Sequence, residues 1–495
     1  MSGPVLRVGP GFNWGLILPV VSGVLGALAL GMLVCALHAV AHDDGTTSSF
    51  LVPAAVLLPL AGLGFLAARR TRTVPLRARD GFLAVTLAWL AAGAAGAAPF
   101  LLEGTLPRLV DGLFESMAGF TTTGSTLVDV EAAPESILLW RSLSQWLGGV
   151  GIVVLVVAIA PAAGLATQRI FHAETSGVTA ERLTPRIADT AKIICGIYGG
   201  LTLVGFGAYW AAGMGPFDAI NHILTTISSG GFSTRSASIG AFDSLAVELV
   251  AIVFMIASGI NFAFYWRALR GDSLWPQAAE VRGFLLILLG STAAVTASLV
   301  LADQYDGVWD GLRAAAFTVA SVGSGTGFLT DDFDLWPDYA RSHLLLLMFI
   351  GGCAGSTSGG IKVVRAMLLG KTVGQELTRQ LRPRAVQVLR TRGKVFSEEV
   401  RRAVLGFTVV YFLVAIAGTF AMLVAGLDLL SAATSAAACL ALLGTGLGDV
   451  GATENFQAIP EGARVVLMFL MLAGRLEVLT VLVLLTPAFW RRNVA

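Results

Sequence analysis

Charged residues are scarce in this sequence, and that scarcity decides its broad class. Only 13% of the 495 residues are Asp, Glu, Lys or Arg, whereas 55% are hydrophobic and the mean hydropathy is +0.78. Because an ordinary soluble domain contains about 25% charged residues, the composition excludes that class and indicates a membrane protein.

Cysteine and histidine are also few, with four and five copies. The cysteines show no CxxC spacing, so the sequence supports neither a disulfide framework nor a thiolate metal site. Among the histidines we assign no metal-ligand set, and no Ser/His/Asp combination converges on a catalytic site. We therefore expect this chain to be no enzyme and to hold no cofactor of its own.

Long apolar segments, in contrast, are abundant. A helix needs roughly 20 apolar residues to cross a hydrocarbon core of about 30 Å, and ten segments could do so. The first is too long for the apolar region of a signal peptide, so we interpret it as a retained span. The ten lie near 14–40, 51–68, 80–102, 136–160, 188–212, 244–267, 281–302, 341–369, 400–425 and 461–487.

The charges are distributed unevenly between the connections. With the N-terminus inside, the inner connections and the chain ends hold 25 of the 33 Lys and Arg residues, and the outer connections hold three. The positive-inside rule then places both termini in the cytoplasm. The outer connections carry 20 of the 32 acids, which would concentrate cations at the surface, although scattered exposed carboxylates are also ordinary.

Each of the four long outer connections contains a partly apolar stretch followed by a turn of small residues with Gly. If Gly124, Gly231, Gly327 and Gly446 are equivalent, successive copies are offset by 107, 96 and 119 residues. We therefore predict an all-α polytopic membrane protein in which four units of span, re-entrant pore loop and span surround one pore in pseudo-fourfold arrangement. The predicted units are an N-terminal helix pair (1–70) and pore repeats at 71–165, 166–270, 271–380 and 381–495.

An aspartate stands ahead of each turn, at Asp111, Asp218, Asp310 and Asp428. We interpret these residues as caps at the start of a short pore helix rather than as transport residues.

The turns have the chemistry of an ion filter. Non-helical backbone at membrane depth is tolerated only where protein buries it or where it lines an aqueous cavity. Gly accepts positive φ, so consecutive carbonyls can replace the water around an ion. The turns lack carboxylates, which favours a monovalent cation over calcium. The predicted ion-binding residues are Thr122, Thr123, Gly124, Ser229, Gly230, Gly231, Gly325, Thr326, Gly327, Gly444, Thr445 and Gly446.

These turns, the Gly-rich segment 351–362 and the tail 474–491 together resemble the Trk/Ktr/HKT superfamily of potassium transporters, most closely the bacterial TrkH type. The resemblance covers almost the whole chain. It implies channel-like, potassium-selective uptake, with potassium as the transported substrate. Gly124 supports potassium, because Ser at this position looks like the mark of sodium preference in the plant branch. The family often has Thr at Gly325 and Pro at Thr445, so the chain departs from the pattern twice.

The eighth apolar segment is interrupted by a run of Gly, Ser and Thr. Such a run cannot form a continuous lipid-facing helix, and from the residues alone it is equally consistent with a surface for close helix packing. The resemblance implies an intramembrane loop that obstructs the pore below the filter. The predicted gate residues are Gly351, Gly352, Gly355, Ser356, Thr357, Ser358, Gly359, Gly360, Lys362 and Arg475.

Arg475 lies in the middle of the last apolar segment. An unpaired charge there costs about 2.5–3.5 kcal/mol on insertion scales, so we expect it to face the pore. The alternative is an ion pair with Glu477, but residues two apart do not share a helix face. Arg141 is nearer a span end, where we expect its side chain to snorkel.

The connection 362–402 holds eleven Lys and Arg residues, and it could bind anionic lipid headgroups or dock a partner. The resemblance implies a homodimer in the inner membrane on a separate TrkA-type ring of nucleotide-binding subunits, so nucleotide would act only through that ring. Two alternatives remain: a proton- or sodium-coupled potassium symporter with an occluded midplane site, and a structural membrane subunit. Fourfold repetition counts against the first and the Gly-rich turns against the second.

Overall fold

The computed structural model describes residues 12–71, 77–159, 187–274, 278–382, 390–391, 394–395 and 398–491. Helices dominate this part of the chain. Its only strands, β1 (Arg390–Thr391) and β2 (Lys394–Val395), form a short antiparallel pair. The predicted all-α class is confirmed.

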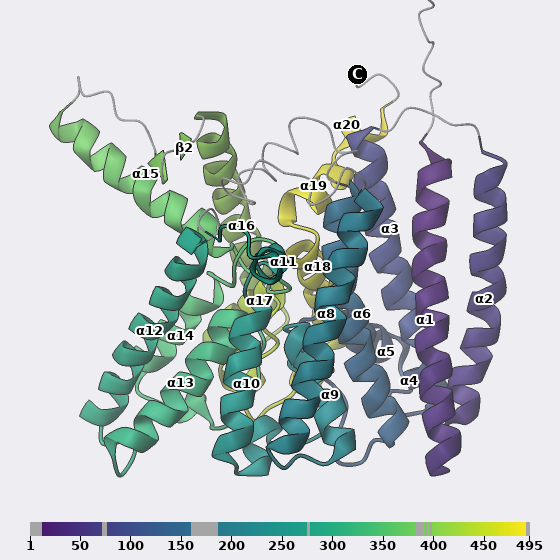
Figure 1. Cartoon of the computed structure of the whole chain (residues 1–495), viewed down its shortest axis with the longest axis horizontal. Helices are drawn as coiled ribbons and strands as arrows, with labels where there is room; N and C mark the ends of the chain where they lie inside the picture. The colour runs from purple at the N-terminus through teal and green to yellow at the C-terminus, as the bar shows by residue number, and fades with distance from the viewer. Residues whose placement is uncertain are drawn as a thin grey trace, which may run out of the picture.

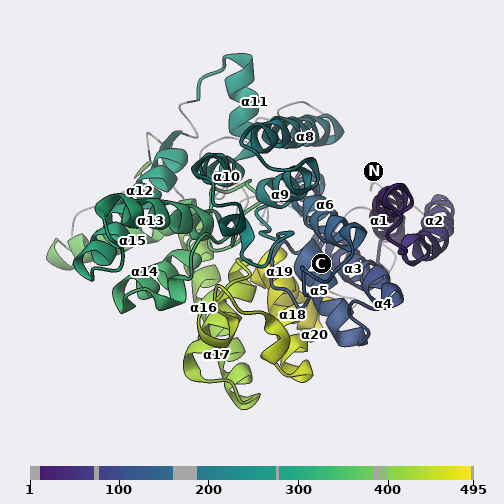
Figure 2. The ribbon, with the colours of Figure 1, turned by 90° about the horizontal axis from the view of Figure 1, so that it is seen from below.

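The first two helices form an antiparallel hairpin at the edge of the molecule. α1 (Trp14–His42) and α2 (Thr47–Arg69) pack side by side, and α1 also packs against α3 (Ala78–Gly96). Figures 1 and 2 show the hairpin standing outside the remaining helices. Many apolar side chains of α2 are exposed, as expected for a helix that faces lipid on most sides.

The other helices repeat one order four times, and Figure 2 shows the four groups around a common centre. Each group has an outer helix, a short pore helix and an inner helix. The outer helices are α3, α8 (Ile187–Ala211), α12 (Ala278–Leu301) and α16 (Glu398–Val424). The pore helices are α5 (Leu109–Phe120), α9 (Pro216–Ile227), α13 (Val308–Ser324) and α17 (Leu429–Ala441). The inner helices are α6 (Glu135–Ile159), α10 (Leu245–Ser258), α14 (Asp338–Met348) and α18 (Glu461–Arg475).

Shorter elements complete the described chain. α4 (Ala98–Glu103) continues α3, and the loops after the second, third and fourth turns contain 3-10 helices, namely η1 (Ser238–Phe242), η2 (Phe333–Leu335), η3 (Gly448–Val450) and η4 (Phe456–Ala458). The second inner helix is followed by α11 (Phe262–Arg270), the third by α15 (Val363–Leu381), and the fourth by α19 (Val478–Leu485) and α20 (Pro487–Trp490). The N-terminal end of α1 lies at the same end of the molecule as α15 and α20 (Figure 1). The division into repeats at the predicted boundaries stays a prediction.

Six described helices are long and apolar enough to cross a membrane, and two bent helix pairs raise the number to eight. The other two predicted spans correspond to α6 and to α14 with the loop after it. The sequence analysis located the sixth and tenth spans but not their bends, which are 93° between α10 and α11 and 117° between α18 and α19. The first bend has a local cause, because Asn261 caps α11 by accepting a bond from the Ala263 N–H at 2.8 Å.

The four helix-start aspartates differ in their roles. Asp428 is the N-cap of α17, and its side chain accepts two backbone N–H bonds from the first turn, at 2.8 and 3.3 Å. Asp111, Asp218 and Asp310 lie inside the first turn of their helices. The predicted cap is therefore correct only for Asp428, although a carboxylate in the first turn still interacts favourably with the helix dipole.

Candidate ion pathway

The chain leaves each pore helix through a residue in the left-handed conformation. These residues are Thr122 (φ 57°), Ser229 (φ 55°), Gly325 (φ 73°) and Leu442 (φ 61°). The N–H of the next residue then bonds to the carbonyl five positions earlier, over 2.8 Å in the first and second turns, 2.9 Å in the third and 3.0 Å in the fourth. This pattern is a Schellman-type helix end. It makes the four turns equivalent at the level of the backbone.

Two residues after each left-handed position stands a glycine with positive φ. These glycines are Gly124 (86°), Gly231 (76°), Gly327 (85°) and Gly444 (84°). A Cβ atom on each would clash with a carbonyl of the next turn, and the four carbonyls belong to Gly230, Thr326, Leu443 and Thr123 respectively. The contacts therefore close into a ring from the first repeat through the fourth and back. Only glycine fits at this centre.

The fourth turn corrects the sequence analysis. Gly444, not Gly446, is equivalent to the other three glycines. Gly446 has no positive φ; its N–H donates to the Val450 carbonyl at 2.8 Å. The prediction of Thr445 and Gly446 as filter residues was therefore wrong in register by two positions. The sequence could not decide, because glycines at alternate positions from 444 to 448 all fit the motif.

The structure brings the other ten predicted filter residues together, and it adds Leu442 and Leu443. Gly124 and Gly231 are half-buried, and the other residues of this set are buried. The residues that form the four turns carry no carboxylate, so their backbone carbonyls are the groups that an ion would meet.

Side chains that the sequence analysis missed hold the turns in place. Gln145 of α6 is fully buried. Its Nε2 donates to the Gly230 carbonyl at 2.7 Å, and its Oε1 accepts from the Phe232 N–H at 3.1 Å. Ser125 Oγ donates to the Gly444 carbonyl at 3.2 Å. A lone amide side chain within an apolar span was the signal that could have identified Gln145.

The loop 349–362, between α14 and α15, lies against the ends of the pore helices. Thr357 Oγ1 donates to the Ile227 carbonyl at 3.1 Å and lies 2.9 Å from Ser229 Oγ. A Cβ atom on Gly359 would clash with the Ala441 carbonyl. Because these contacts involve the ends of α9 and α17 and the left-handed residue Ser229, the loop lies beside the turns at the C-terminal ends of these pore helices.

The same loop has a fixed conformation. Its glycines at 351, 355 and 360 have φ angles of 69°, 76° and 74°. The Cys353 N–H donates to the Gly259 carbonyl at 2.8 Å, and the Ala354 N–H donates to Glu280 Oε1 at 2.7 Å. The break in the eighth span is confirmed, and its loop is attached to α12 and to the bend between α10 and α11.

Arg475 contacts this loop directly. Its side chain is buried; one terminal nitrogen donates to the Thr357 carbonyl at 2.9 Å and the other to the Gly148 carbonyl at 2.8 Å. Glu477 pairs instead with Arg365 at the start of α15, over 3.0 Å. The alternative pairing of Arg475 with Glu477 is therefore wrong. Lys362 Nζ donates to the Ser358 carbonyl, so two positive charges lie at the loop.

Arg141 does not snorkel, contrary to the sequence analysis. It is 2% exposed, and its Nε donates to Glu115 Oε1 at 2.8 Å. Its other nitrogens donate to the Ser233 carbonyl and to Thr126 Oγ1, at 3.2 and 2.9 Å. Since Thr126 and Ser233 follow the first and second turns, the buried ion pair fixes the chain directly after both turns.

Replacement of Arg141 by methionine is expected to destabilise the protein by about 3–5 kcal/mol, because the fully buried Glu115 would lose its positively charged partner. The double variant Arg141→Met with Glu115→Leu removes both charges, and we expect it to recover much of that loss. Thermal unfolding in detergent measures both. Equal destabilisation in the two variants would contradict the interpretation.

Comparisons with known proteins give one consistent result. The family described as TrkH, cation transport protein, matches residues 53–492. The Trk system potassium uptake protein TrkH of Vibrio parahaemolyticus is 39% identical over 96% of this chain and 99% of its own length, and that of Escherichia coli K12 is 39% identical over 95% and 98%. The crystal structure of the potassium transporter TrkH from Vibrio parahaemolyticus matches with a TM-score of 0.87 and 37% identity, and it covers 96% of this chain and 99% of that one.

Proposed function

Because this chain belongs to the TrkH family of cation transport proteins, we propose that it takes up potassium across a cell membrane through the centre of its four turns. The observation that carries the proposal is the closed ring of contacts between Gly124, Gly231, Gly327 and Gly444 and the carbonyls of the neighbouring turns. The several apolar helices make the chain a multi-pass membrane protein.

The ring explains how a cation would be selected. The backbone carbonyls around the centre can replace the hydration shell of a monovalent ion. Four pore helices end at the same centre, and the C-terminal end of a helix carries a partial negative charge that favours cations. The absence of carboxylates from the turns keeps the site weak enough for an ion to leave again.

The loop 349–362 would act as the gate. It lies beside the turns, and Arg475 holds it closed by joining the Thr357 carbonyl to the Gly148 carbonyl of the first inner helix. The positive charge of Arg475 would also repel a cation that leaves the filter. Since α15 follows the loop directly, a force on α15 would be transmitted to the gate.

The direction of transport and the regulator belong to the same proposal. The positive-inside distribution supports an orientation with both termini, α15 and the basic connection in the cytoplasm, and the protein would lie in the inner membrane. There a separate TrkA-type ring of nucleotide-binding subunits would act on a homodimer of this chain. Potassium is the transported substrate, and nucleotide would act only through the ring.

Replacement of Gly124 by serine is expected to reduce the preference for potassium over sodium. The new Cβ would displace the Gly230 carbonyl, which would then lose its interaction with the ion. Because one interaction with a charged group contributes about 1.5–3 kcal/mol, the ratio of potassium to sodium uptake should fall roughly tenfold or more. Potassium, rubidium and sodium uptake would be measured in cells that lack their own high-affinity potassium uptake.

The matched control is Gly462→Ser in α18, where a Cβ meets open space. This variant should keep both uptake and selectivity. If Gly124→Ser folds and retains the wild-type ratio, or if the wild type takes up sodium as readily as potassium, the proposed pathway is wrong.

A further inference from the structure

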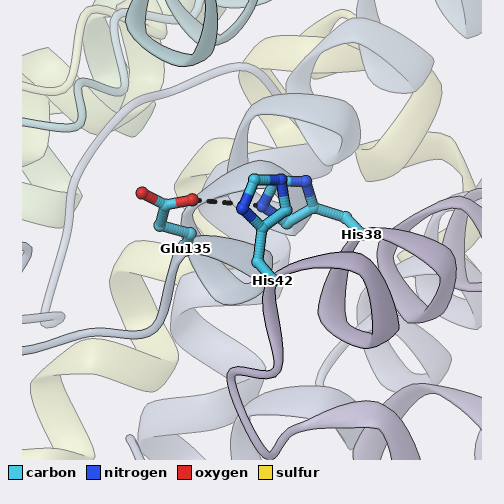
Figure 3. Close-up of side chains that lie close together, drawn as sticks. All are labelled: His38, His42 and Glu135. Atoms are coloured by element: carbon cyan, nitrogen blue, oxygen red, sulfur yellow. Dashed lines mark hydrogen bonds and ion pairs between the residues drawn. The ribbon is translucent and has the colours of Figure 1, made fainter.

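Three potential metal ligands meet at the outer end of the hairpin, away from the ion pathway. His38 and His42 lie on the last two turns of α1, and Glu135 is the first residue of α6 (Figure 3). One ligand atom from each lies within 4.8 Å of the others. His38 Nε2 and Glu135 Oε2 are 3.3 Å apart, and the two imidazole rings face each other with centroids 4.2 Å apart.

We propose that His38, His42 and Glu135 bind a first-row transition dication such as Zn²⁺. Two imidazoles and one carboxylate are ligands that zinc prefers, and three protein ligands leave a fourth tetrahedral position for water. Histidines four apart lie on one face of a helix, as the geometry here requires. The site also lies at the C-terminal end of α1, where the helix dipole favours a cation.

Binding requires only a small contraction. Zinc bonds of about 2.0–2.1 Å place tetrahedral ligand atoms roughly 3.4 Å apart, and the His38–Glu135 distance already has this value. His42 and Glu135 are exposed, so their side chains can rotate toward the ion. His38 is held more firmly, because its ring stacks on Phe217 at 5.4 Å.

A simple hydrogen bond between His38 and Glu135 does not account for the position of His42. Among the described contacts, His42 makes only the ring contact with His38. The neighbouring carboxylate of Asp44 is engaged elsewhere, since it accepts bonds from Thr46 and from the Ser136 N–H. The two histidines and Glu135 thus form a set of three ligands and not part of a larger acidic cluster.

The sequence analysis assigned no metal-ligand set to the histidines, and this proposal departs from it. The spacing of His38 and His42 was visible, but the third ligand lies 93 residues beyond His42 and only the fold brings it close. Because Glu135 belongs to the first repeat, a bound ion would link the hairpin to that repeat.

The test is zinc binding to the purified full-length protein without an affinity tag, measured by calorimetry in detergent. We expect one zinc ion per chain at this site. His42→Ala and Glu135→Gln should each weaken zinc binding at least about tenfold. Even the loss of a residue that only hydrogen-bonds to a metal ligand lowers metal affinity about 10–100-fold. Both residues are exposed, so neither variant should prevent folding.

The control variant is His343→Ala, which removes a half-buried histidine of α14 outside the cluster and should bind zinc as the wild type does. Zinc should also raise the unfolding temperature of the wild type but not that of His42→Ala, and an excess of Mg²⁺ should not compete. Wild-type protein without stoichiometric zinc binding, or equal binding by the double variant His42→Ala with Glu135→Gln, would overturn the proposal.

Discussion

Replacement of Gly444 by alanine is expected to abolish most potassium uptake, whereas replacement of Gly446 by alanine leaves selectivity unchanged. Gly444 has φ +84°, and its Cβ would meet the carbonyl of Thr123 and lie 2.7 Å from the carbonyl carbon of Gly124. These are backbone atoms of the first turn, so they cannot move aside without distorting the ring. An alanine at Gly446 would instead meet the side chains of Thr434 and Val450, at 2.9 and 2.8 Å.

The expected size follows from backbone strain. A residue held in a sparsely populated backbone region costs of order 1–3 kcal/mol, and each 1.4 kcal/mol is a factor of ten. We therefore expect the uptake rate per folded molecule to fall at least about tenfold in Gly444→Ala. The clash of the new Cβ with the backbone of Thr123 and Gly124 adds to this decrease. Gly446→Ala should lower the yield of folded protein but keep the potassium-to-sodium ratio.

The measurement is rubidium and sodium flux into proteoliposomes, normalised to the monodisperse protein recovered by size-exclusion chromatography. The normalisation separates a damaged filter from a damaged fold. The opposite order, with Gly446→Ala changing selectivity and Gly444→Ala behaving as the wild type, would restore the register that the sequence alone suggested.

The sequence was sufficient where a physical requirement is local. A membrane helix needs a continuous apolar segment, so hydropathy located the spans. A crowded centre that accepts no Cβ requires glycine, so the first three turns were found from Gly124, Gly231 and Gly327. The broken eighth span was visible because a run of small residues cannot form a lipid-facing helix.

The sequence was insufficient where the requirement depends on contacts between distant residues. Arg141 looked like a surface charge because Glu115, its buried partner, lies 26 positions away on another helix. The partner of Glu477 proved to be Arg365, 112 positions earlier. Neither pairing has a local pattern. The bend at Glu477 likewise depends on a positive φ of 61°. The residue is not a glycine, so the sequence gives no sign of this conformation.

At the proposed gate, replacement of Arg475 by glutamine is expected to have the opposite effect and to increase potassium uptake. Arg475 is the side chain that bridges the Thr357 carbonyl of the loop and the Gly148 carbonyl of α6. Hydrogen bonds to a charged group contribute about 1.5–3 kcal/mol each. Loss of one of them would shift the balance between closed and open loop roughly tenfold or more, as long as water in the opened pore hydrates the two carbonyls.

Arg475→Lys separates the two roles of this side chain. Lysine keeps the positive charge but lacks the planar fork that reaches both carbonyls. If the bridge closes the gate, the lysine variant should conduct more than the wild type and less than the glutamine variant. If the charge alone acts as the barrier, lysine should match the wild type. Rubidium flux into proteoliposomes without any regulatory subunit measures the difference.

The control is Arg464→Gln, which removes another buried arginine from α18. Arg464 pairs with Asp111 at the start of α5 and donates to the Gln457 carbonyl at 2.9 Å, and neither contact involves the loop. Its loss should reduce stability without raising flux per folded molecule, because a buried Asp111 left unpaired costs free energy of folding and does not release the loop. An increase in flux confined to the Arg475 variants would identify the contact with Thr357 as the one that keeps the pathway closed. Unchanged flux in Arg475→Gln would show that the loop is closed by its bonds to Gly259 and Glu280 instead.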